Sequence, residues 1–250
     1  MADGYDPAYF ARIAEKEPQS FWFRARNRLL TWAFRTYFHD ARSLLEIGAG
    51  TGFVLATLHA AFPELRLVGS ELYAEALDLA RNRLPPDVEL IQLDARALPY
   101  DSDFDVVGAF DVLEHIVDDE AVLAGMRRAV RAGGGLLVTV PQHPRLWSAG
   151  DTFAHHVRRY TRPELVRKVD RAGFDVVRTT SFVTSLLPAM VASRVAHRVA
   201  RKPYDPIEEL DPGPLNTVFE RMLDGERRLI ERGASFPFGG SLLLVARARG

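Results

Sequence analysis

A glycine-rich turn between a predicted strand and a predicted helix is the stretch of this sequence with the clearest chemical potential. It reads Leu-Leu-Glu-Ile-Gly-Ala-Gly-Thr-Gly-Phe over residues 44–53, so the glycines are Gly48, Gly50 and Gly52. Glycine permits a tight turn and lets a ligand approach the backbone. The helix that follows offers unpaired N–H groups at its start. The sequence therefore predicts a ligand that lies against this turn.

The glycine spacing and a nearby carboxylate narrow the kind of ligand. Dinucleotide-binding folds use G-x-G-x-x-G, but here the third glycine comes one residue early. Glu46 stands two residues before the first glycine. Its carboxylate would favour a ligand with a cationic amino group and would give little to an anionic pyrophosphate. A G-x-G-x-G run can also be purely structural, so the residues around it have to show whether this turn binds a ligand.

Acidic residues stand at the predicted ends of the next strands. Glu71 comes 19 residues after Gly52, about where nucleotide-binding folds place the acidic side chain that binds ribose hydroxyls. Asp94 ends the third predicted strand, where it could accept from an adenine amino group or cap a helix. The fourth predicted strand ends at Phe110 and Asp111. These positions suit a ligand that contains a nucleoside.

Histidines and one tyrosine are the candidates for acid–base chemistry. His115 follows the fourth predicted strand, at the sheet edge where such folds bind ligands; catalysis, pocket lining and a structural role all stay open for it. A second group lies in the long segment after the fifth predicted strand and contains His143, His155, His156 and Tyr160. An imidazole titrates near neutral pH, so it can remove a proton from an acceptor. Our catalytic candidates are His115, His143, His156 and Tyr160.

A metal centre is the less favoured interpretation of these histidines. His155 and His156 are adjacent, so they cannot face one ion from a helix. No clear acidic triad accompanies His143, His155 and His156. We therefore predict no metal site.

Predicted strands and helices alternate through the middle of the chain. Apolar runs predict strands at 43–47, 65–69, 88–93, 104–110 and 135–140, and helices are predicted at 53–62, 73–84 and 119–131. Near-continuous apolar strands that alternate with helices are typical of a parallel sheet covered on both faces. Three glycines, at 133–135, stand where the third helix would need a C-cap.

Further elements flank this alternation. An amphipathic helix is predicted at 20–38, and a capping box at 161–164 opens a helix that ends near Ala172. Strands follow at 174–180 and 241–248. Residues 183–240 are a long excursion between them, because most connections have about 4–6 residues. We predict an inserted helical cap there, with a helix over 215–232.

Composition excludes several classes of protein. The chain has 250 residues, 32 Lys and Arg against 33 Asp and Glu, and no Cys. Disulfide frameworks, Cys-ligated zinc, iron–sulfur clusters and thiol nucleophiles are therefore excluded. The balanced charge gives no general attraction for nucleic acid or anionic membranes. With no signal-like N-terminus and no long apolar run, we expect a soluble cytoplasmic protein.

Taken together, these motifs resemble the class I S-adenosylmethionine-dependent methyltransferases, and most of all their small-molecule branch with the ubiquinone and menaquinone methyltransferases. The residues that carry the resemblance are the glycine turn, Glu71, Asp94, the run FDVVGAFDVLEHI and the run RAGGGLLVTVP. It covers about residues 43–183 and the last strand. It implies an α/β, Rossmann-like, mostly parallel sheet of seven strands in the order 3-2-1-4-5-7-6, with helices on both faces and a helical cap between strands 6 and 7. The implied division is an N-terminal helical lid (1–40), a cofactor-binding core (41–182 and 241–250) and the cap (183–240).

The resemblance also implies S-adenosylmethionine as the cofactor and a role for each matching residue. Glu46 would hold the methionyl amino group, the three glycines would carry the cofactor, and Glu71 would bind both ribose hydroxyls. Leu72, Asp94 and Ala95 would meet the adenine, and Phe110 and Asp111 would line the methionyl side. Family members also use an arginine from the preceding helix on the methionyl carboxylate. We predict Arg28 for this role, with Arg24 and Arg26 as alternatives.

The expected activity is methyl transfer to an oxygen or nitrogen of a small molecule. A nicotinamide-dependent oxidoreductase is the main alternative, which the glycine spacing and Glu46 disfavour. The second alternative is a protein that binds S-adenosylmethionine without catalysing a reaction. The expected partner is a small-molecule acceptor and not nucleic acid. Contact with a membrane or lipid through 182–202 is less expected, and the chain is predicted to be a monomer or homodimer.

Overall fold

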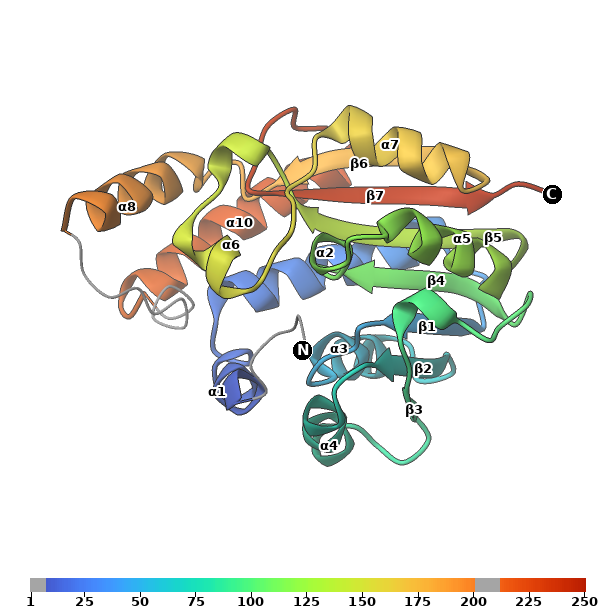
Figure 1. Ribbon diagram of the computed structural model, residues 1–250. Coiled ribbons are helices and arrows are strands. Elements are labelled where there is room, and N and C mark those ends of the chain that lie inside the picture. Colours follow the sequence, from blue (N-terminus) through green and yellow to red (C-terminus); the bar gives the residue numbers. More distant parts are fainter. Residues whose placement is uncertain (1–7, 201–211) are drawn as a thin grey trace.

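The computed structural model describes residues 8–200 and 212–250, and a seven-stranded sheet forms its middle layer (Figure 1). The strand order is β3-β2-β1-β4-β5-β7-β6, which confirms the predicted fold. Five strands pair in parallel: β1 (Ser43–Ile47), β2 (Arg66–Glu71), β3 (Glu89–Gln92), β4 (Phe104–Phe110) and β5 (Val130–Pro141). The antiparallel strand β7 (Ser241–Ala248) lies between β5 and β6 (Phe174–Phe182).

Helices cover both faces of the sheet because side chains alternate along each strand. Leu44 and Leu243 belong to the apolar cluster on one face, and their neighbours Leu45 and Leu244 belong to the cluster on the other. The first cluster is shared with α2 (Phe21–Tyr37), α3 (Phe53–Ala61), α4 (Ala74–Arg83) and α10 (Leu215–Glu231). The second cluster is shared with α5 (Asp119–Ala129) and α7 (Arg162–Arg171).

Short elements gather beyond the carboxyl ends of the parallel strands, on the left of Figure 1. They include α1 (Ala8–Lys16), α6 (Ala149–Phe153) and α8 (Leu187–Ala200). Three short 3₁₀ turns complete the described elements: η1 (Ala95–Ala97), η2 (Leu113–His115) and η3 (Pro144–Leu146). None of the helices in the described residues is long and apolar enough to cross a membrane.

The prediction that the three glycines at 133–135 cap a helix is wrong. Helix α5 already ends at Ala129, and Gly133, Gly134 and Gly135 lie inside the long strand β5. A Cβ atom on Gly135 would lie 2.1 Å from the ring of Phe38, so close packing of this ring against the strand requires glycine. The predicted capping box of α7 is confirmed, with Thr161 at the N-cap.

Parts of the predicted lid and cap lie outside the described residues. These parts are residues 1–7 of the lid and residues 201–211 of the cap.

Candidate active site

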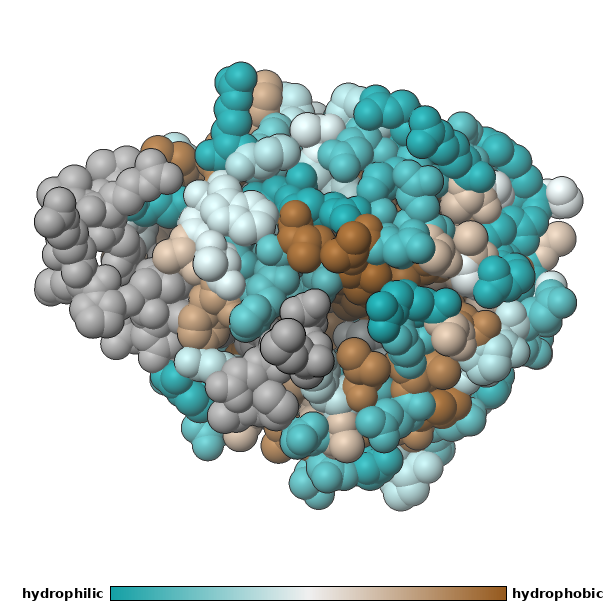
Figure 2. All heavy atoms as spheres, viewed as in Figure 1, coloured by the Kyte–Doolittle hydropathy of each residue, from teal (hydrophilic) through white to brown (hydrophobic). Residues whose placement is uncertain are grey.

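A cavity of about 910 Å³ opens at the carboxyl ends of the parallel strands. Its walls come from the glycine turn after β1, the ends of β2 to β5, the segment that carries α6, and the helices α1, α2, α8 and α10. Figure 2 shows a hollow on this side of the molecule, bordered by hydrophobic residues (brown). The topology thus places the predicted ligand site at the expected edge of the sheet.

The glycines of the turn divide into two groups. All three have positive φ angles: +66° at Gly48, +54° at Gly50 and +75° at Gly52. Gly48 and Gly50 line the cavity, and a Cβ atom on Gly50 would meet no described atom within 4 Å. Gly52 does not line it, because a Cβ atom there would lie 2.8 Å from Leu84 after α4. The third glycine therefore serves the packing of α3 on α4 and not ligand contact.

Glu71 lies in the cavity wall and fixes the shape of the turn. Its Oε2 accepts a hydrogen bond from the backbone N–H of Gly50 at 2.9 Å. Its Oε1 accepts from the N–H groups of Leu72 at 2.8 Å and Tyr73 at 3.1 Å. Burial raises the pKa of this carboxyl, and the three backbone donors oppose the shift. Glu71 therefore couples the end of β2 to the glycine turn.

The residues predicted to meet the adenine also reach the cavity. Leu72 is half exposed, and Asp94 and Ala95 lie beside it in the wall. Asp94 caps η1 by accepting from the N–H of Arg96 at 2.9 Å, and the Arg96 guanidinium lowers the pKa of its carboxyl. The helix-capping interpretation of Asp94 is therefore correct, and the same side chain also faces the cavity.

The structure brings Arg26, and not Arg28, to the cavity. Arg26 is almost fully buried, its Nη1 donates to Asp111 Oδ2 at 2.8 Å, and its guanidinium lies 4.7 Å from the ring centre of Trp22. Residues two apart on a helix point to opposite sides. Arg28 accordingly turns away and binds two carboxylates of α10, those of Glu220 and Asp224. Arg28 therefore does not reach the cavity, whereas Arg26, which the sequence had left as an alternative, lines it.

Glu46 is a buried carboxyl with an unmet hydrogen bond. It is 2% exposed, and its Oε2 has no hydrogen-bond partner among the described residues. Burial raises its pKa well above the ordinary value, and the charge of Arg26 acts in the opposite direction. A buried acceptor without a donor costs about 1–3 kcal/mol. Unlike Gly48 and Gly50, Glu46 is not among the residues that line the cavity, and its Oε2 is an acceptor without a donor in the described part of the chain.

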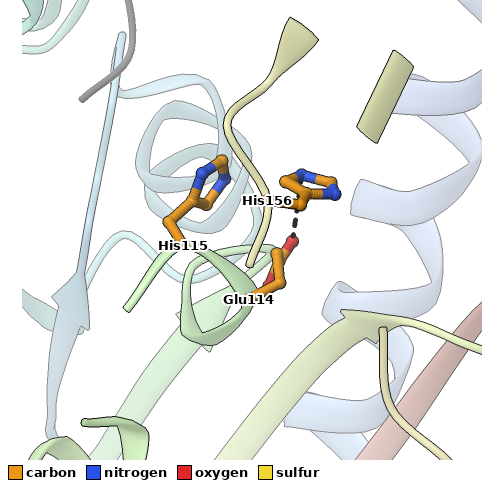
Figure 3. A group of neighbouring side chains, drawn as sticks. All are labelled: Glu114, His115 and His156. Atoms are coloured by element: carbon orange, nitrogen blue, oxygen red, sulfur yellow. Dashed lines mark ion pairs between the residues drawn. The ribbon is translucent and has the colours of Figure 1, made fainter. Parts of the chain in front are cut away.

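Two histidines, His115 and His156, lie close together near Glu114 (Figure 3). The rings of His115 and His156 are 4.7 Å apart at an interplanar angle of 82°, and both line the cavity. Burial lowers the pKa of His115 to about 3, so this ring is neutral near pH 7. Glu114 joins them, with Oε1 3.9 Å from Nε2 of His156.

Asp151 holds His156 in one orientation. Its Oδ1 lies 3.0 Å from Nδ1 of His156 and accepts from Nε of Arg159 at 2.6 Å. The hydrogen bonds from His156, Arg159 and Ser148 lower the pKa of Asp151, so the carboxylate is charged. The hydrogen bond to Asp151 therefore places a proton on Nδ1 of His156, and Nε2 is the ring nitrogen that faces Glu114.

The structure does not support the catalytic role predicted for His143 and Tyr160. Neither side chain lines the cavity. His143 stacks on Phe238 at 5.6 Å between ring centres. Tyr160 is fully buried on the other face of the sheet, where its hydroxyl donates to Asp119 Oδ2 at 2.5 Å. Burial and this carboxylate raise the pKa of Tyr160, so the phenol stays protonated.

Tyr160→Phe should therefore lower stability and leave turnover intact. The change removes a hydrogen bond to a charged acceptor, a loss of about 1.5–3 kcal/mol in the free energy of unfolding. Arg158 and Lys168 still pair with Asp119, so the carboxylate does not become isolated. Urea denaturation measures the stability. A large loss of turnover in folded Tyr160→Phe protein would return this residue to the catalytic set.

Sequence reasoning gave no role to Glu114 or Asp151. Asp151 belongs to a capping box with Ser148 at the start of α6, and the Ser-x-x-Asp spacing is a signal that could have located it. Glu114 directly precedes His115 in the chain, and nothing in the sequence indicates that η2 turns it inward to 0% exposure.

Comparisons with known proteins agree with this geometry. A family described as "Methyltransferase domain" matches residues 44–134. The chain is 33% identical over 120 residues to trans-aconitate 2-methyltransferase of Azoarcus sp., a match that covers 48% of this chain and 46% of that enzyme. It is 28% identical over 232 residues to a "Probable S-adenosylmethionine-dependent methyltransferase" of Mycobacterium tuberculosis, which covers 88% of this chain and 83% of the relative.

A solved structure shares the fold. Phosphoethanolamine N-methyltransferase 2 of Haemonchus contortus, in complex with S-adenosyl-L-methionine, superposes with a TM-score of 0.60 at 17% identity. The match covers 90% of this chain and 53% of that one. The strand order, the glycine turn with its acidic partners and these sequence matches lead to one family. Residues 44–134 therefore match a methyltransferase domain, and the described chain has the fold of the class I S-adenosylmethionine-dependent methyltransferases.

Proposed function

We propose that this protein transfers a methyl group from S-adenosylmethionine to an oxygen or nitrogen atom of a small molecule held in the same cavity. The observation that carries the proposal is the continuity of this cavity. The glycine turn and Glu71 line one part of it, and His115 and His156 line another. One compartment therefore offers a cofactor subsite and an acceptor subsite.

The residues on the cofactor side fit S-adenosylmethionine. The unpartnered Oε2 of Glu46 suits the cationic methionyl amino group. Arg26 would meet the methionyl carboxylate, and the open face of Gly50 would let the cofactor lie on the turn. The remaining contacts would come from residues along the same wall: Gly48, Glu71, Leu72, Asp94, Ala95, Phe110 and Asp111.

The acceptor side suits a discrete, largely apolar molecule. Its wall contains side chains from the N-terminal segment and from the segment between β6 and β7: Phe21, Trp22, Leu186, Met190 and Phe219. A cavity of about 910 Å³ lies within the usual range of small-molecule sites, about 300–1,000 Å³. We propose that residues 1–40 act as a lid and residues 183–240 as a cap over the core, and that together they select the acceptor. The net charge of -1 gives nucleic acid no general attraction.

The chemistry requires mainly alignment. S-adenosylmethionine supplies a methyl group that is already activated on a sulfonium. The walls of the cavity have to hold the acceptor in line with it, a proximity effect worth up to about 7–11 kcal/mol. A hydroxyl or ammonium acceptor must also lose a proton. The group formed by Glu114, His115 and His156 is where the site can handle this proton.

Calorimetric titrations with S-adenosylmethionine and with NAD test the cofactor assignment. We expect binding of the first only, and binding of NAD alone would support the oxidoreductase alternative. Glu71→Ala should weaken S-adenosylmethionine binding about 10- to 100-fold, because it removes charge-assisted hydrogen bonds of about 1.5–3 kcal/mol. Glu89→Ala is the matched control, since Glu89 is an exposed glutamate of β3 that pairs with Arg66.

A screen of hydroxylated and amine-bearing small molecules for methyl transfer then tests the activity. Binding of S-adenosylmethionine without transfer to any acceptor would favour the non-catalytic alternative. Transfer to an acceptor that shields Trp22 and Phe219 from solvent would support the proposed acceptor subsite.

A further inference from the structure

Glu114, His115 and His156 come together at the acceptor side of the cavity, from two segments of the chain. Glu114 and His115 belong to η2 after β4, and His156 lies on the segment that follows α6 (Figure 3). One ligand atom from each side chain lies within 4.8 Å of those from the other two. This set differs from the histidines that the sequence groups together, which are His143, His155 and His156.

Glu114 is the most deeply buried member of this group. Its side chain is 0% exposed, and both carboxyl oxygens lack a hydrogen-bond partner among the described residues. Buried polar atoms are almost always paired with protein or water. Such a carboxyl, with Oε1 3.9 Å from Nε2 of His156, is placed to accept a cation together with the imidazoles.

His156 has the orientation of a metal ligand. Asp151 accepts from its Nδ1, and Nε2 faces Oε1 of Glu114 at 3.9 Å. Metal-binding histidines usually donate their other N–H to a carboxylate in this manner, which fixes the tautomer and the ring. With the proton on Nδ1, the Nε2 lone pair and the carboxylate face one another, and a cation between them would satisfy both.

The surrounding charges also allow a cation. Two of the arginines that line the cavity are paired, Arg26 with Asp111 and Arg159 with Asp151. The three carboxyl groups of Asp111, Glu114 and Asp151 outnumber these two guanidinium groups.

We propose that Glu114, His115 and His156 bind a divalent transition-metal ion whose open coordination positions face the acceptor. Two imidazoles and one carboxylate suit Zn²⁺, Fe²⁺ or Co²⁺ better than Mg²⁺. Two atoms at about 2.1 Å from one ion are at most about 4.2 Å apart, so small side-chain rotations close the 4.8 Å group around it. The inference rests on the proposed function for its role: the ion would bind an oxygen of the acceptor, which favours a hydroxyl-bearing molecule.

Titration of the metal-stripped chain with Co²⁺, followed by visible absorption, tests the site directly. We expect one ion per chain. Glu114→Gln and His156→Ala should weaken binding at least about 100-fold, and Asp151→Asn, which only positions His156, about 10- to 100-fold. His59→Ala is the matched control, because His59 pairs with Asp87 on the surface and lines no part of the cavity. Its affinity for Co²⁺ should equal that of the unchanged chain.

The outcomes separate this inference from the proposed function. Folded protein that binds S-adenosylmethionine and transfers methyl groups but takes up no Co²⁺ overturns the metal site alone. Co²⁺ binding that survives Glu114→Gln and His156→Ala also overturns it. Co²⁺ binding that is lost in Glu114→Gln and His156→Ala supports the metal site, even if no acceptor is methylated. A failure to methylate any acceptor would count only against the proposed methyl transfer. Thermal melting of each variant identifies a change that merely unfolds the chain.

Discussion

Arg26→Ala should weaken the binding of S-adenosylmethionine about 10- to 100-fold, whereas Arg28→Ala should leave it nearly unchanged. Arg26 is 7% exposed and lies in the cavity wall. A charge-assisted hydrogen bond in such a place contributes about 1.5–3 kcal/mol, which is about one to two factors of ten in affinity. Calorimetric titration of the two variants measures the difference.

The pair is well matched because both arginines lie on α2 and both carry ion pairs. Arg28 binds Glu220 and Asp224 on α10, so its loss should affect the packing of α10 on α2 and not the cofactor. Arg26→Ala also leaves Asp111 without its partner, so its melting temperature has to be compared. Arg26→Lys keeps the charge but not the planar fork, and it should recover part of the affinity.

An equal effect of the two substitutions would contradict this assignment. A loss of affinity confined to Arg28→Ala would restore the original prediction and require α2 to rotate when the cofactor binds. A loss confined to Arg26→Ala would support Arg26 as the arginine that meets the methionyl carboxylate.

The sheet could be predicted from the sequence because its signals are local. Apolar runs bounded by turns are independent of distant contacts, and the predicted bounds of β1, β4 and β7 agree with the structure. The positions of the glycine turn and Glu71 could also be predicted from the sequence. A short strand–turn–helix unit and the end of the next parallel strand must meet at one edge of the sheet.

The direction in which single side chains point could not be predicted in the same way. Arg24, Arg26 and Arg28 stand at alternate positions of α2, and only the packing of α2 against the sheet decides that Arg26 faces the cavity. The segment between β5 and α7 has no periodicity, so nothing local indicates that Tyr160 turns inward to Asp119. The same segment turns His143 toward Phe238, which lies far away in the sequence.

His156→Ala should lower kcat about 100- to 1,000-fold and leave the affinity for S-adenosylmethionine close to that of the unchanged chain. Removal of a positioned acid–base group typically costs about 10²–10⁴ in rate. His156 lies in the cavity beside His115 and is held by Asp151, whereas the cofactor residues lie on the glycine turn and the end of β2. The effect is expected whether His156 takes the proton itself or holds a cation that binds the acceptor.

His143→Ala is the control for this prediction, because His143 belongs to the same segment and lies against Phe238 outside the cavity. Its kcat and KM should stay near those of the unchanged chain. A loss of turnover with His143→Ala and none with His156→Ala would reverse the placement of the acceptor. If both variants kept full turnover, the acceptor would need no proton removed by this segment. Such a result would favour an amine that reaches the cavity already neutral, since a hydroxyl needs a base.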